Sequence, residues 1–512
     1  MAPEGRNNLP QPRIILVYPK LGMSGSFVNH MPLSLLYAAV DSIKGGFDVD
    51  ILDVRLSPNT WQNDLSKKTD ENTIIVGISV MTGTPIAYAQ EISAYVRRTL
   101  PHAKIVWGGP HATFNGTEIL VDKNVDFAIA GYGSEPFHLL AKTISGADDA
   151  PSINEINGLI YRDNTGKTVS VPTSNTFEFI DYQDIPYHLV EADLDRYGQL
   201  DNDMRIFSMY SVMGCPYECS FCSSPAQYRG IKKKYQPLSA SDVADHIQYV
   251  RERYGANYIY FIDDDSFAKL SHVEGVIDEI NRRGIKVSLG FRGARINEIK
   301  RMDDAFLSKL AAAGTDIMHI GAESGSQRIL DLIRKDCSPE DIIAVNQKMA
   351  RHPEIKTGYN WIVGLPGETI EDLRLTQKLM LRLINDNPSA ILFIPNKFYP
   401  LPQTELFEIA LGYGYVGPKK LEDWVEMEVE GLYRPPWYTD EISASINMMQ
   451  VVSYFVDDKI NKVDTGKTFK YWFARVMASV YTPLARWRLK VGYSGLLIEN
   501  SLLRRVAAYY RG

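Results

Sequence analysis

The stretch Met213-Gly-Cys-Pro-Tyr-Glu-Cys-Ser-Phe-Cys222 holds three of the chain's four cysteines and directly follows a predicted strand near 207–213. Three thiols within eight positions are the wrong distribution for a disulfide framework, so metal ligation is the better explanation. A cubane iron–sulfur cluster has four irons and usually four thiolate ligands. A loop with three thiols therefore leaves one iron open to a ligand from outside the protein.

Structural zinc, bound by three cysteines and a histidine, is the alternative for this loop. The nearest histidine in sequence is His246, some way along the following predicted helix, and the spacing matches no common zinc motif. The fourth cysteine, Cys337, lies far downstream in a predicted turn between helices. We therefore expect Cys215, Cys219 and Cys222 to bind the cluster and Cys337 to be an incidental thiol.

The cluster motif begins an alternating series of strands and helices over residues 205–400, which predicts an α/β fold. Six repeats are too few for a complete eightfold barrel but suit a partial barrel, with its chemistry at the C-terminal strand ends. The strands are predicted near 207–213, 257–262, 286–291, 316–321, 356–363 and 390–395, and the helices near 239–254, 270–283, 303–313, 339–351 and 370–386.

Residues 1–145 show the same alternation and predict an open parallel sheet. Residues 146–204 are rich in polar and turn residues, so a linker with a hairpin around 158–171 is expected. Residues 401–512 predict a helical cap that includes helices over 440–460 and 468–510. The N-terminal strands are predicted at 13–18, 49–54, 74–80, 104–108 and 125–130, with helices at about 33–44 and 85–99.

The composition is that of a globular protein, with 45% hydrophobic and 23% charged residues, and a length of 512 residues fits a multidomain enzyme. The net charge of -7 argues against a general nucleic-acid binder. The sequence shows neither a membrane-crossing apolar stretch nor the apolar core of a signal peptide, so a cytoplasmic location is expected. Arg486, Trp487, Arg488 and Lys490 would suit a helix on a membrane surface, although a cationic face over a buried apolar one is commoner.

The three-cysteine spacing, with the aromatic Phe221 before the last cysteine, resembles the signature of the radical S-adenosylmethionine (SAM) superfamily. The resemblance implies that the open iron of a four-iron four-sulfur cluster chelates SAM. One-electron reduction would then yield methionine and a 5′-deoxyadenosyl radical. Roughly residues 205–405 match in register, including Phe261-Ile-Asp-Asp-Asp-Ser-Phe267, Gly293-Ala-Arg-Ile296, Gly321-Ala-Glu-Ser-Gly-Ser326, Val363-Gly-Leu-Pro-Gly-Glu-Thr369 and Tyr399-Pro-Leu-Pro-Gln-Thr404.

These motifs imply contacts with SAM. Glu323 and Ser324 would hydrogen-bond its amino or ribose groups, and Arg295 would pair with its carboxylate. Gly364 would let the backbone approach the adenine closely, although such a glycine can also serve only to turn the chain. The other expected contacts are Phe221 and Asp263, and the alternative role of the aspartates at 263–265 is to cap the next helix.

The N-terminal domain lacks a G-x-G-x-x-G motif, which weakens a dinucleotide-binding interpretation. Ser79-Val-Met81, followed after 26 residues by Gly108-Gly109, resembles instead the flavodoxin-like (Rossmann-like) cobalamin-binding domain. The stretch aligned with that family's cobalt-binding histidine motif is Pro32-Leu-Ser-Leu-Leu-Tyr37 and contains no histidine. The resemblance is therefore to the cobalamin-binding radical SAM class, many members of which hold cobalamin without a histidine axial ligand.

Eight residues are the expected cobalamin contacts: Ser79, Met81, Thr82, Gly108, Gly109, His111, Gly131 and Glu135. For His111, a hydrogen bond to the cofactor tail or to a neighbouring residue is favoured over cobalt ligation. A flavodoxin-like domain that no longer binds its cofactor is the alternative to cobalamin binding.

The two cofactors together imply a C-methyltransferase that acts on an unactivated carbon of a small molecule or natural-product intermediate. The 5′-deoxyadenosyl radical would abstract hydrogen and methylcobalamin would donate the methyl group, so no catalytic side chain is assigned. An electron donor such as flavodoxin or ferredoxin is the expected partner. The alternatives are a cobalamin-dependent oxidative cyclase or oxidase directed at a tetrapyrrole or lipid, and a non-catalytic cobalamin or iron–sulfur carrier or sensor.

An apolar substrate pocket could be lined by four aromatic residues, Tyr399, Trp424, Trp437 and Tyr438. Core packing is the commoner role of such residues.

Overall fold

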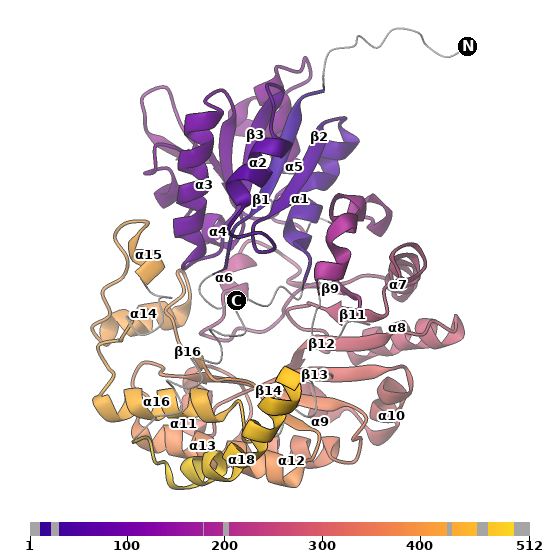
Figure 1. The fold of residues 1–512 in the computed structure, drawn as a ribbon, viewed down its shortest axis with the longest axis vertical. Coiled ribbons are helices and arrows are strands. Elements are labelled where there is room, and N and C mark those ends of the chain that lie inside the picture. The colour runs from indigo at the N-terminus through magenta and orange to yellow at the C-terminus, as the bar shows by residue number, and fades with distance from the viewer. Residues whose placement is uncertain are drawn as a thin grey trace. The chain divides into compact units, whose positions relative to one another are not determined.

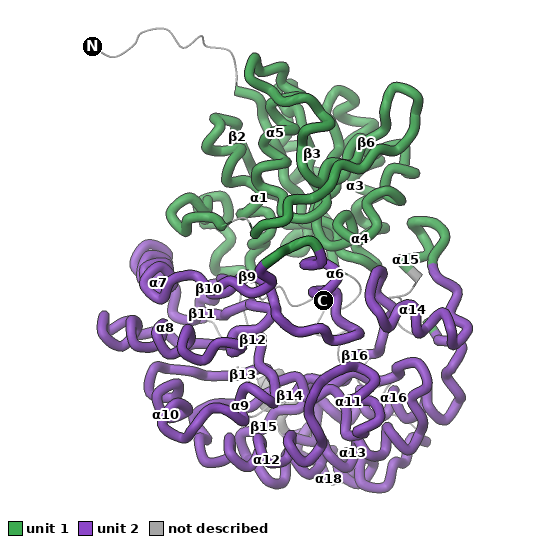
Figure 2. Tube along the Cα trace, turned by 180° about the vertical axis from the view of Figure 1, so that it is seen from behind, with its two compact units in different colours: residues 1–196, 230–232, 418–433 green, residues 197–229, 233–417, 434–512 purple. Residues whose placement is uncertain are grey.

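The structure is a computed structural model that describes residues 11–21, 30–177, 179–197, 204–426, 433–457 and 469–495. The chain forms two compact units, which are described separately (Figure 2). Unit 1 comprises residues 1–196, 230–232 and 418–433, and unit 2 comprises residues 197–229, 233–417 and 434–512.

Unit 1 is built on a seven-stranded sheet in the order β2-β1-β3-β4-β5-β6-β7, of which β1 to β5 are parallel (Figure 1). Helix α1 packs against α5. Strands buried on both faces read as continuous apolar runs, as Ile14 to Val17 do in β1. The strands are β1 (Arg13–Tyr18), β2 (Asp48–Asp53), β3 (Thr73–Ser79), β4 (Lys104–Gly108), β5 (Phe127–Ile129), β6 (Leu159–Arg162) and β7 (Thr168–Ser170).

The helices of unit 1 confirm the two predicted from sequence, α1 (Leu33–Lys44) and α3 (Pro85–Thr99). Three further helices, α2 (Trp61–Lys68), α4 (Pro110–Ile119) and α5 (Ser134–Ser145), were not predicted. Helix α4 has non-helical dihedrals at Asn115 and contains Gly116, which explains its weak sequence pattern.

The predicted hairpin around 158–171 is confirmed as β6 and β7, which extend the sheet in the antiparallel direction. Arg162, the last residue of β6, fixes the hairpin to the chain that precedes β5. Its Nη2 donates to the carbonyl oxygens of Leu120, Asp122 and Val125 at 2.8–2.9 Å, and its Nε donates to Leu120 at 3.1 Å.

We predict that Arg162→Ala will lower the free energy of unfolding of unit 1 by about 2–3 kcal/mol, because three carbonyl groups lose a cationic donor. Hydrogen exchange should accelerate at the amides of residues 120–125 and of β6. Lys167→Ala, at the exposed tip of the same hairpin, is the control and should leave both measurements unchanged. Equal protection in the two variants would contradict the proposed anchor.

Unit 2 contains the predicted series of parallel strands in the order β15-β14-β13-β12-β11-β8, with β16 paired to β14 (Figure 1). Neighbours in sequence are neighbours in the sheet, as in a partial barrel. The strands are β8 (Ile206–Met209), β11 (Tyr258–Phe261), β12 (Ser288–Arg295), β13 (Thr315–Glu323), β14 (Lys356–Val363), β15 (Ala390–Leu392) and β16 (Asn396–Lys397).

The helices that follow these strands confirm the predicted series. They are α7 (Ala240–Tyr254), α8 (Leu270–Arg282), α10 (Asp304–Ala312), α12 (Pro339–Met349) and α13 (Ile370–Asp386). Two short helices, α9 (Ile296–Arg301) and α11 (Gln327–Leu332), were not predicted, because six residues are too few to show a helical period.

The single strand predicted over 207–213 is wrong, because the structure divides it into β8 and β9 (Val212–Gly214). The backbone N–H groups of Ser211 and Val212 donate to the Asp263 carboxylate at 2.8 and 3.1 Å, which removes them from a strand ladder. Strand β9 then pairs antiparallel with β10 (Tyr235–Pro237).

The helix predicted over 440–460 is α16 (Asp440–Val452) and ends earlier than predicted. The chain turns after Val452, and the Asp457 carboxylate accepts a hydrogen bond from the backbone of Leu392 in β15 at 2.6 Å. The helix predicted over 468–510 corresponds to α18 (Phe469–Val491). The parts of these two predictions within 458–468 and 496–510 lie outside the described residues.

Candidate functional site

The loop that carries the three cysteines follows β9 and is tied to the chain after α11. Ser220 donates from its backbone N–H to the carbonyl oxygen of Ile333 at 3.2 Å and from its hydroxyl to that of Leu332 at 2.9 Å. All three cysteines are free thiols; Cys219 is buried, and Cys215 and Cys222 are partly exposed. The local sequence thus presents three sulfurs that form no disulfide within one anchored loop.

Polar donors point at two of these sulfurs. Arg295 donates from Nη1 to the Cys219 Sγ at 2.9 Å, and Ser224 donates from its backbone N–H to the Cys222 Sγ at 3.5 Å. Burial raises the pKa of the Cys222 thiol. A positive charge and N–H donors stabilise thiolate ligands and tune the clusters that they hold.

The donor set fits an iron–sulfur cubane. In the described part of the chain, no three His, Cys, Asp or Glu side chains converge tightly enough to bind one metal ion. Cubane ligands bind different irons and lie further apart than that. Cys215, Cys219 and Cys222 would therefore hold such a cluster, with Arg295 beside one sulfur.

Each aspartate of the 263–265 run has its own partners. Asp263 is buried and accepts hydrogen bonds from the Ser211 and Ser266 hydroxyls at 2.7 and 3.0 Å, besides the two backbone donors at the start of β9. Burial raises its pKa to about 6. Asp265 accepts from the backbone of Phe267 and Ala268 in the turn before α8. Asp263 therefore positions the start of β9, and its contact with SAM stays a prediction.

Glu323, at the end of β13, forms a buried ion pair with Lys335. The Nζ of Lys335 lies 2.8 Å from Glu323 Oε1, and both side chains are less than a tenth exposed. Glu323, Arg334 and Asp336 all have positive φ, which is unusual for residues with a Cβ. Such strain is tolerated where the surrounding structure demands it and concentrates at functional sites.

Lys335 also joins this pair to the cluster loop, because its carbonyl oxygen accepts from Arg295 Nη2 at 2.9 Å. Arg295 additionally lies over the ring of Tyr217, 3.9 Å from its centroid. The structure therefore brings together three predicted site residues, Cys219, Arg295 and Glu323, through one lysine. The sequence contained no signal for Lys335, since its partner is reached only through a strained turn.

We predict that Lys335→Met will lower the free energy of unfolding by about 3–5 kcal/mol, because it leaves the Glu323 carboxylate buried without its cation. The double variant Lys335→Met with Glu323→Gln should recover most of that loss. Denaturant titration followed by circular dichroism measures both. A single variant as stable as the wild type would show that the pair contributes nothing.

The other two predicted SAM contacts on these strand ends face protein atoms. Ser324 is fully buried, with its hydroxyl 3.2 Å from the Thr376 hydroxyl on α13. Gly364 has φ of +80°, and a Cβ there would lie 1.6 Å from the Tyr438 hydroxyl. Trp437 donates from Nε1 to the Gly364 carbonyl oxygen at 3.0 Å. Phe221 is half-buried in the cluster loop. The roles of these residues toward SAM stay predictions.

Glu368, in the same loop as Gly364, is a buried acid that accepts hydrogen bonds from the backbone N–H groups of Gly364 and Leu365. Burial raises its pKa from 4.5 to about 8. The folded protein therefore keeps this proton through neutral pH, whereas the unfolded chain releases it above about pH 4.5. The stability that this group contributes is complete at low pH and is lost as the pH rises toward 8.

We predict that the difference in free energy of unfolding, wild type minus Glu368→Gln, will fall between pH 5 and pH 8 by at most about 1.4 kcal/mol per pH unit. Glutamine keeps an oxygen for the two backbone donors and cannot ionise. Denaturant titration at several pH values gives the difference, and a pH-independent difference would show that Glu368 is already ionised in the folded state.

In unit 1, the expected cobalamin residues gather at the carboxyl ends of β3, β4 and β5. Gly109 has φ of +90°, and a Cβ there would lie 2.9 Å from the Val80 backbone nitrogen and 3.0 Å from the Ser79 hydroxyl. A Cβ at Gly108 would meet nothing within 4 Å. The space left by these two glycines fits a cofactor that approaches the backbone closely.

The remaining candidates lie around the space left by Gly108 and Gly109. The Gly131 backbone donates to the Thr113 hydroxyl at 3.1 Å, which joins the end of β5 to α4. Met81 is 42% exposed just after β3, and Glu135 lies in the first turn of α5. Ser79, Met81, Gly108, Gly109, Gly131 and Glu135 would hold cobalamin through this edge, and their contacts with it stay predictions.

His111 is fully buried, and its Nδ1 lies 3.1 Å from the Thr82 hydroxyl. Burial lowers its pKa to about 4, so the ring is neutral at physiological pH. Its ring also packs edge-on against Trp424 at 5.8 Å, and Trp424 donates from Nε1 to Glu118 at 2.9 Å. The expected hydrogen bond of His111 to a neighbouring residue is confirmed. Trp424 is 2% exposed and packs within unit 1, which agrees with the core-packing alternative, and its role in a substrate pocket stays a prediction.

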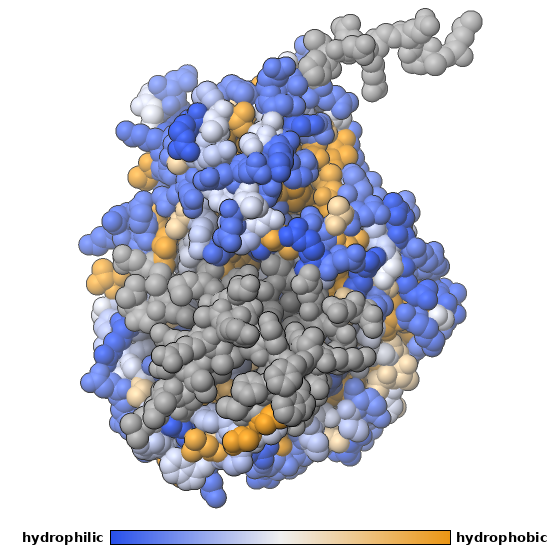
Figure 3. All heavy atoms as spheres, viewed as in Figure 1, coloured by the Kyte–Doolittle hydropathy of each residue, from blue (hydrophilic) through white to orange (hydrophobic). Residues whose placement is uncertain are grey.

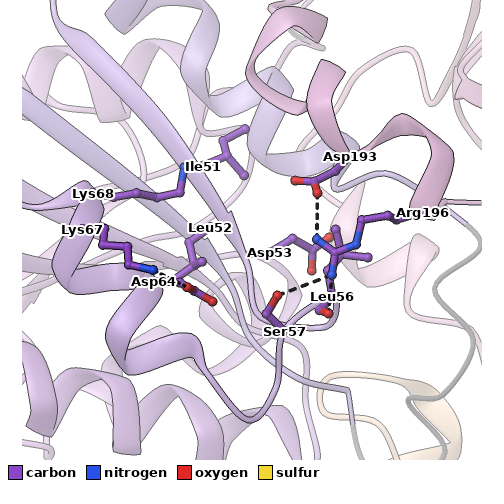
Figure 4. A pocket seen from close by; sticks show the side chains of 10 residues that line it. All are labelled: Ile51, Leu52, Asp53, Leu56, Ser57, Asp64, Lys67, Lys68, Asp193 and Arg196. Carbon is purple, nitrogen blue, oxygen red and sulfur yellow. Dashed lines mark hydrogen bonds and ion pairs between the residues drawn. The ribbon is translucent and has the colours of Figure 1, made fainter.

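A separate hollow of about 380 Å³ in unit 1 is formed by β2, α2 and the short helix η3 (Tyr187–Arg196) (Figure 4). Charged groups that line it pair with one another, as Arg196 does with Asp193 at 2.8 Å and Lys67 with Asp64 at 3.8 Å. None of the expected cobalamin residues lines it.

Comparison with known proteins agrees with this arrangement. The family model of the radical SAM superfamily matches residues 209–380, and that of the B12 binding domain matches residues 26–141. The anaerobic magnesium-protoporphyrin IX monomethyl ester cyclase of Cereibacter sphaeroides is 26% identical over 79% of this chain and 66% of the relative. The cytidylyl-2-hydroxyethylphosphonate methyltransferase of Streptomyces wedmorensis is 24% identical over 76% of this chain and 79% of the relative.

Among solved structures, the radical SAM methyltransferase TsrM of Kitasatospora setae, with cobalamin and a [4Fe-4S] cluster bound, aligns with a TM-score of 0.65. It shares 16% identity, over 93% of this chain and 99% of that one. The cobalamin-dependent SAM radical enzyme OxsB aligns with a TM-score of 0.67 at 15% identity, over 94% of this chain and 72% of that one. The predicted α/β fold, with a cobalamin-binding sheet, a partial barrel and C-terminal helices, is confirmed.

Proposed function

We propose that this chain, a cobalamin-binding member of the radical SAM superfamily, is a C-methyltransferase that acts on an unactivated carbon of a small molecule. The observation that carries the proposal is that one chain contains two features. They are a three-thiol loop supported by Arg295 and, in a B12 binding domain, the space left by Gly108 and Gly109. Relatives named as methyltransferases align over most of this chain.

The chemistry itself belongs to the cofactors, which supply a 5′-deoxyadenosyl radical and a methyl group when bound. The chain's residues bind and orient them. Arg295 places positive charge beside Cys219, and Lys335 holds the Glu323 carboxylate in one orientation at the end of β13. The buried sulfur, Arg295 and Glu323 lie in surroundings that exclude water, where such electrostatic contacts are strongest.

We propose that the electron that initiates the reaction comes from another protein. Cys337 is the only cysteine outside the cluster loop, and a lone thiol cannot hold a second cluster. An external one-electron donor such as flavodoxin or ferredoxin is therefore part of the proposal.

An oxidative cyclase or oxidase is the second candidate, because two anaerobic magnesium-protoporphyrin cyclases align over 79% of this chain. Methylation and oxidation differ in the mass of the product. A gain of one methylene unit supports methylation, and a loss of hydrogen or gain of oxygen supports oxidation.

We predict that anaerobically reconstituted protein will contain cobalamin and one four-iron cluster, and will form 5′-deoxyadenosine from SAM with a reductant. With methyl-deuterated SAM, mass spectrometry of candidate substrates should show transfer of the label. Replacing Cys215, Cys219 and Cys222 by alanine should abolish the cluster and the 5′-deoxyadenosine, whereas Cys337→Ala is the matched control and should retain both. Cofactor binding without any 5′-deoxyadenosine would favour a carrier or sensor instead.

A further inference from the structure

Helix α18 (Phe469–Val491) has an exposed apolar stripe on one face. Val476, Val480, Leu484, Trp487 and Val491 are between 39% and 72% exposed. Their spacings of four, four, three and four residues place them in one row along the helix. Figure 3, in the same view as Figure 1, shows apolar atoms at the surface in the lower part of the molecule, where Figure 1 draws α18.

The opposite face of α18 is already packed against unit 2. Ala478, Ala485 and Leu489 are at most 2% exposed, and α18 contacts both α13 and α16. Thr482 and Arg486 anchor it by donating to the carbonyl oxygens of Phe455 and Val456 at 2.8 and 2.9 Å. A surface helix normally turns polar residues outward. The outer stripe is therefore not needed for packing within the described chain, and contiguous exposed apolar surface marks an interaction site.

The charge of this segment identifies the occupant. Residues 465–498 contain six lysines and arginines and no aspartate or glutamate, in a chain whose net charge is -7. Arg486 and Arg488 donate to backbone carbonyl oxygens of the described chain, whereas Lys490 is exposed and lies beside the stripe. Trp487 and Tyr493, with ring centroids 5.6 Å apart, add amphipathic aromatic rings at one end. An apolar stripe in a basic segment, with an exposed lysine, Trp and Tyr at one end, is the pattern of a helix that lies in the interface of an anionic membrane.

We propose that α18 docks on an anionic lipid surface, with Val480, Leu484 and Trp487 inserted at the boundary between headgroups and acyl chains. Lys490, the exposed cation near the end of the stripe, then faces the phosphate groups. The proposed contact is peripheral, and no described helix is long and apolar enough to cross a bilayer. A second copy of the chain is a poorer occupant, because two such helices would bring like charges together. The inference goes beyond the proposed reaction and does not depend on it.

The test uses the full-length reconstituted protein under anaerobic conditions and measures co-sedimentation with phosphatidylcholine vesicles, with and without phosphatidylglycerol. We expect binding to the anionic vesicles that weakens as salt rises. The triple variant Val480→Ser, Leu484→Ser, Trp487→Ser should reduce the partition coefficient at least about tenfold, and Lys490→Glu should reduce it less. Val121→Ser with Val416→Ser, which removes two other exposed apolar side chains, is the matched control and should bind as the wild type does.

Several outcomes would overturn the proposal. They are equal sedimentation of the wild type and the triple variant, equal binding to vesicles without phosphatidylglycerol, and failure of the wild type to bind vesicles at all. A wild-type dimer that the triple variant dissociates, without vesicle binding, would assign the stripe to a second copy. Salt-sensitive binding of an oligonucleotide without vesicle binding would assign the cations to nucleic acid. Iron content and formation of 5′-deoxyadenosine, which should match the wild type, establish that the triple variant is folded.

Discussion

The arrangement of the cluster loop depends on the guanidinium of Arg295. It donates to the Cys219 Sγ and to the Lys335 carbonyl oxygen, and it lies over the ring of Tyr217. A buried cation is costly unless its donors are satisfied and negative charge lies close by. The Asp336 carboxylate lies 3.6 Å from Nη2, and thiolates that bind an iron–sulfur cluster add negative charge beside the guanidinium. The buried arginine therefore stabilises the thiolates of the three-thiol loop, and those thiolates stabilise the arginine.

The strained turn at residues 334–336 follows from the same constraint. Among the described residues, three of the four non-glycine residues with positive φ are Glu323, Arg334 and Asp336. Each such residue costs about 1–3 kcal/mol. The turn places the Lys335 ammonium on Glu323 and its carbonyl oxygen on Arg295. A relaxed turn would satisfy the backbone but would leave the Glu323 carboxylate without a partner.

Both units build their sites at the carboxyl edge of a parallel sheet, where each strand delivers a loop to the same place. Glycines with positive φ occur at both edges, at Gly109 in unit 1 and at Gly364 in unit 2. At Gly109 the neighbouring atoms are backbone and a serine hydroxyl, whereas at Gly364 the neighbour is the ring of Tyr438. The first glycine thus permits the approach of two strand ends, and the second permits the C-terminal segment to cover a barrel loop.

The sequence by itself determined the features that depend on neighbours along the chain. The helices at 33–44 and 85–99, the order of the barrel strands and the thiol spacing at 215–222 all follow from local patterns of apolar residues, turns and cysteines. Only the tertiary structure decided the break between β8 and β9, the pairing of Lys335 with Glu323, and the packing of Trp424 against His111. In each of these the partner is distant in sequence or is reached through a strained turn. Likewise, the composition of α18 showed apolar and cationic residues, but only packing against α13 and α16 decided which face stays exposed. Local periodicity fixes which residues share a face, whereas burial depends on what the rest of the chain places against it.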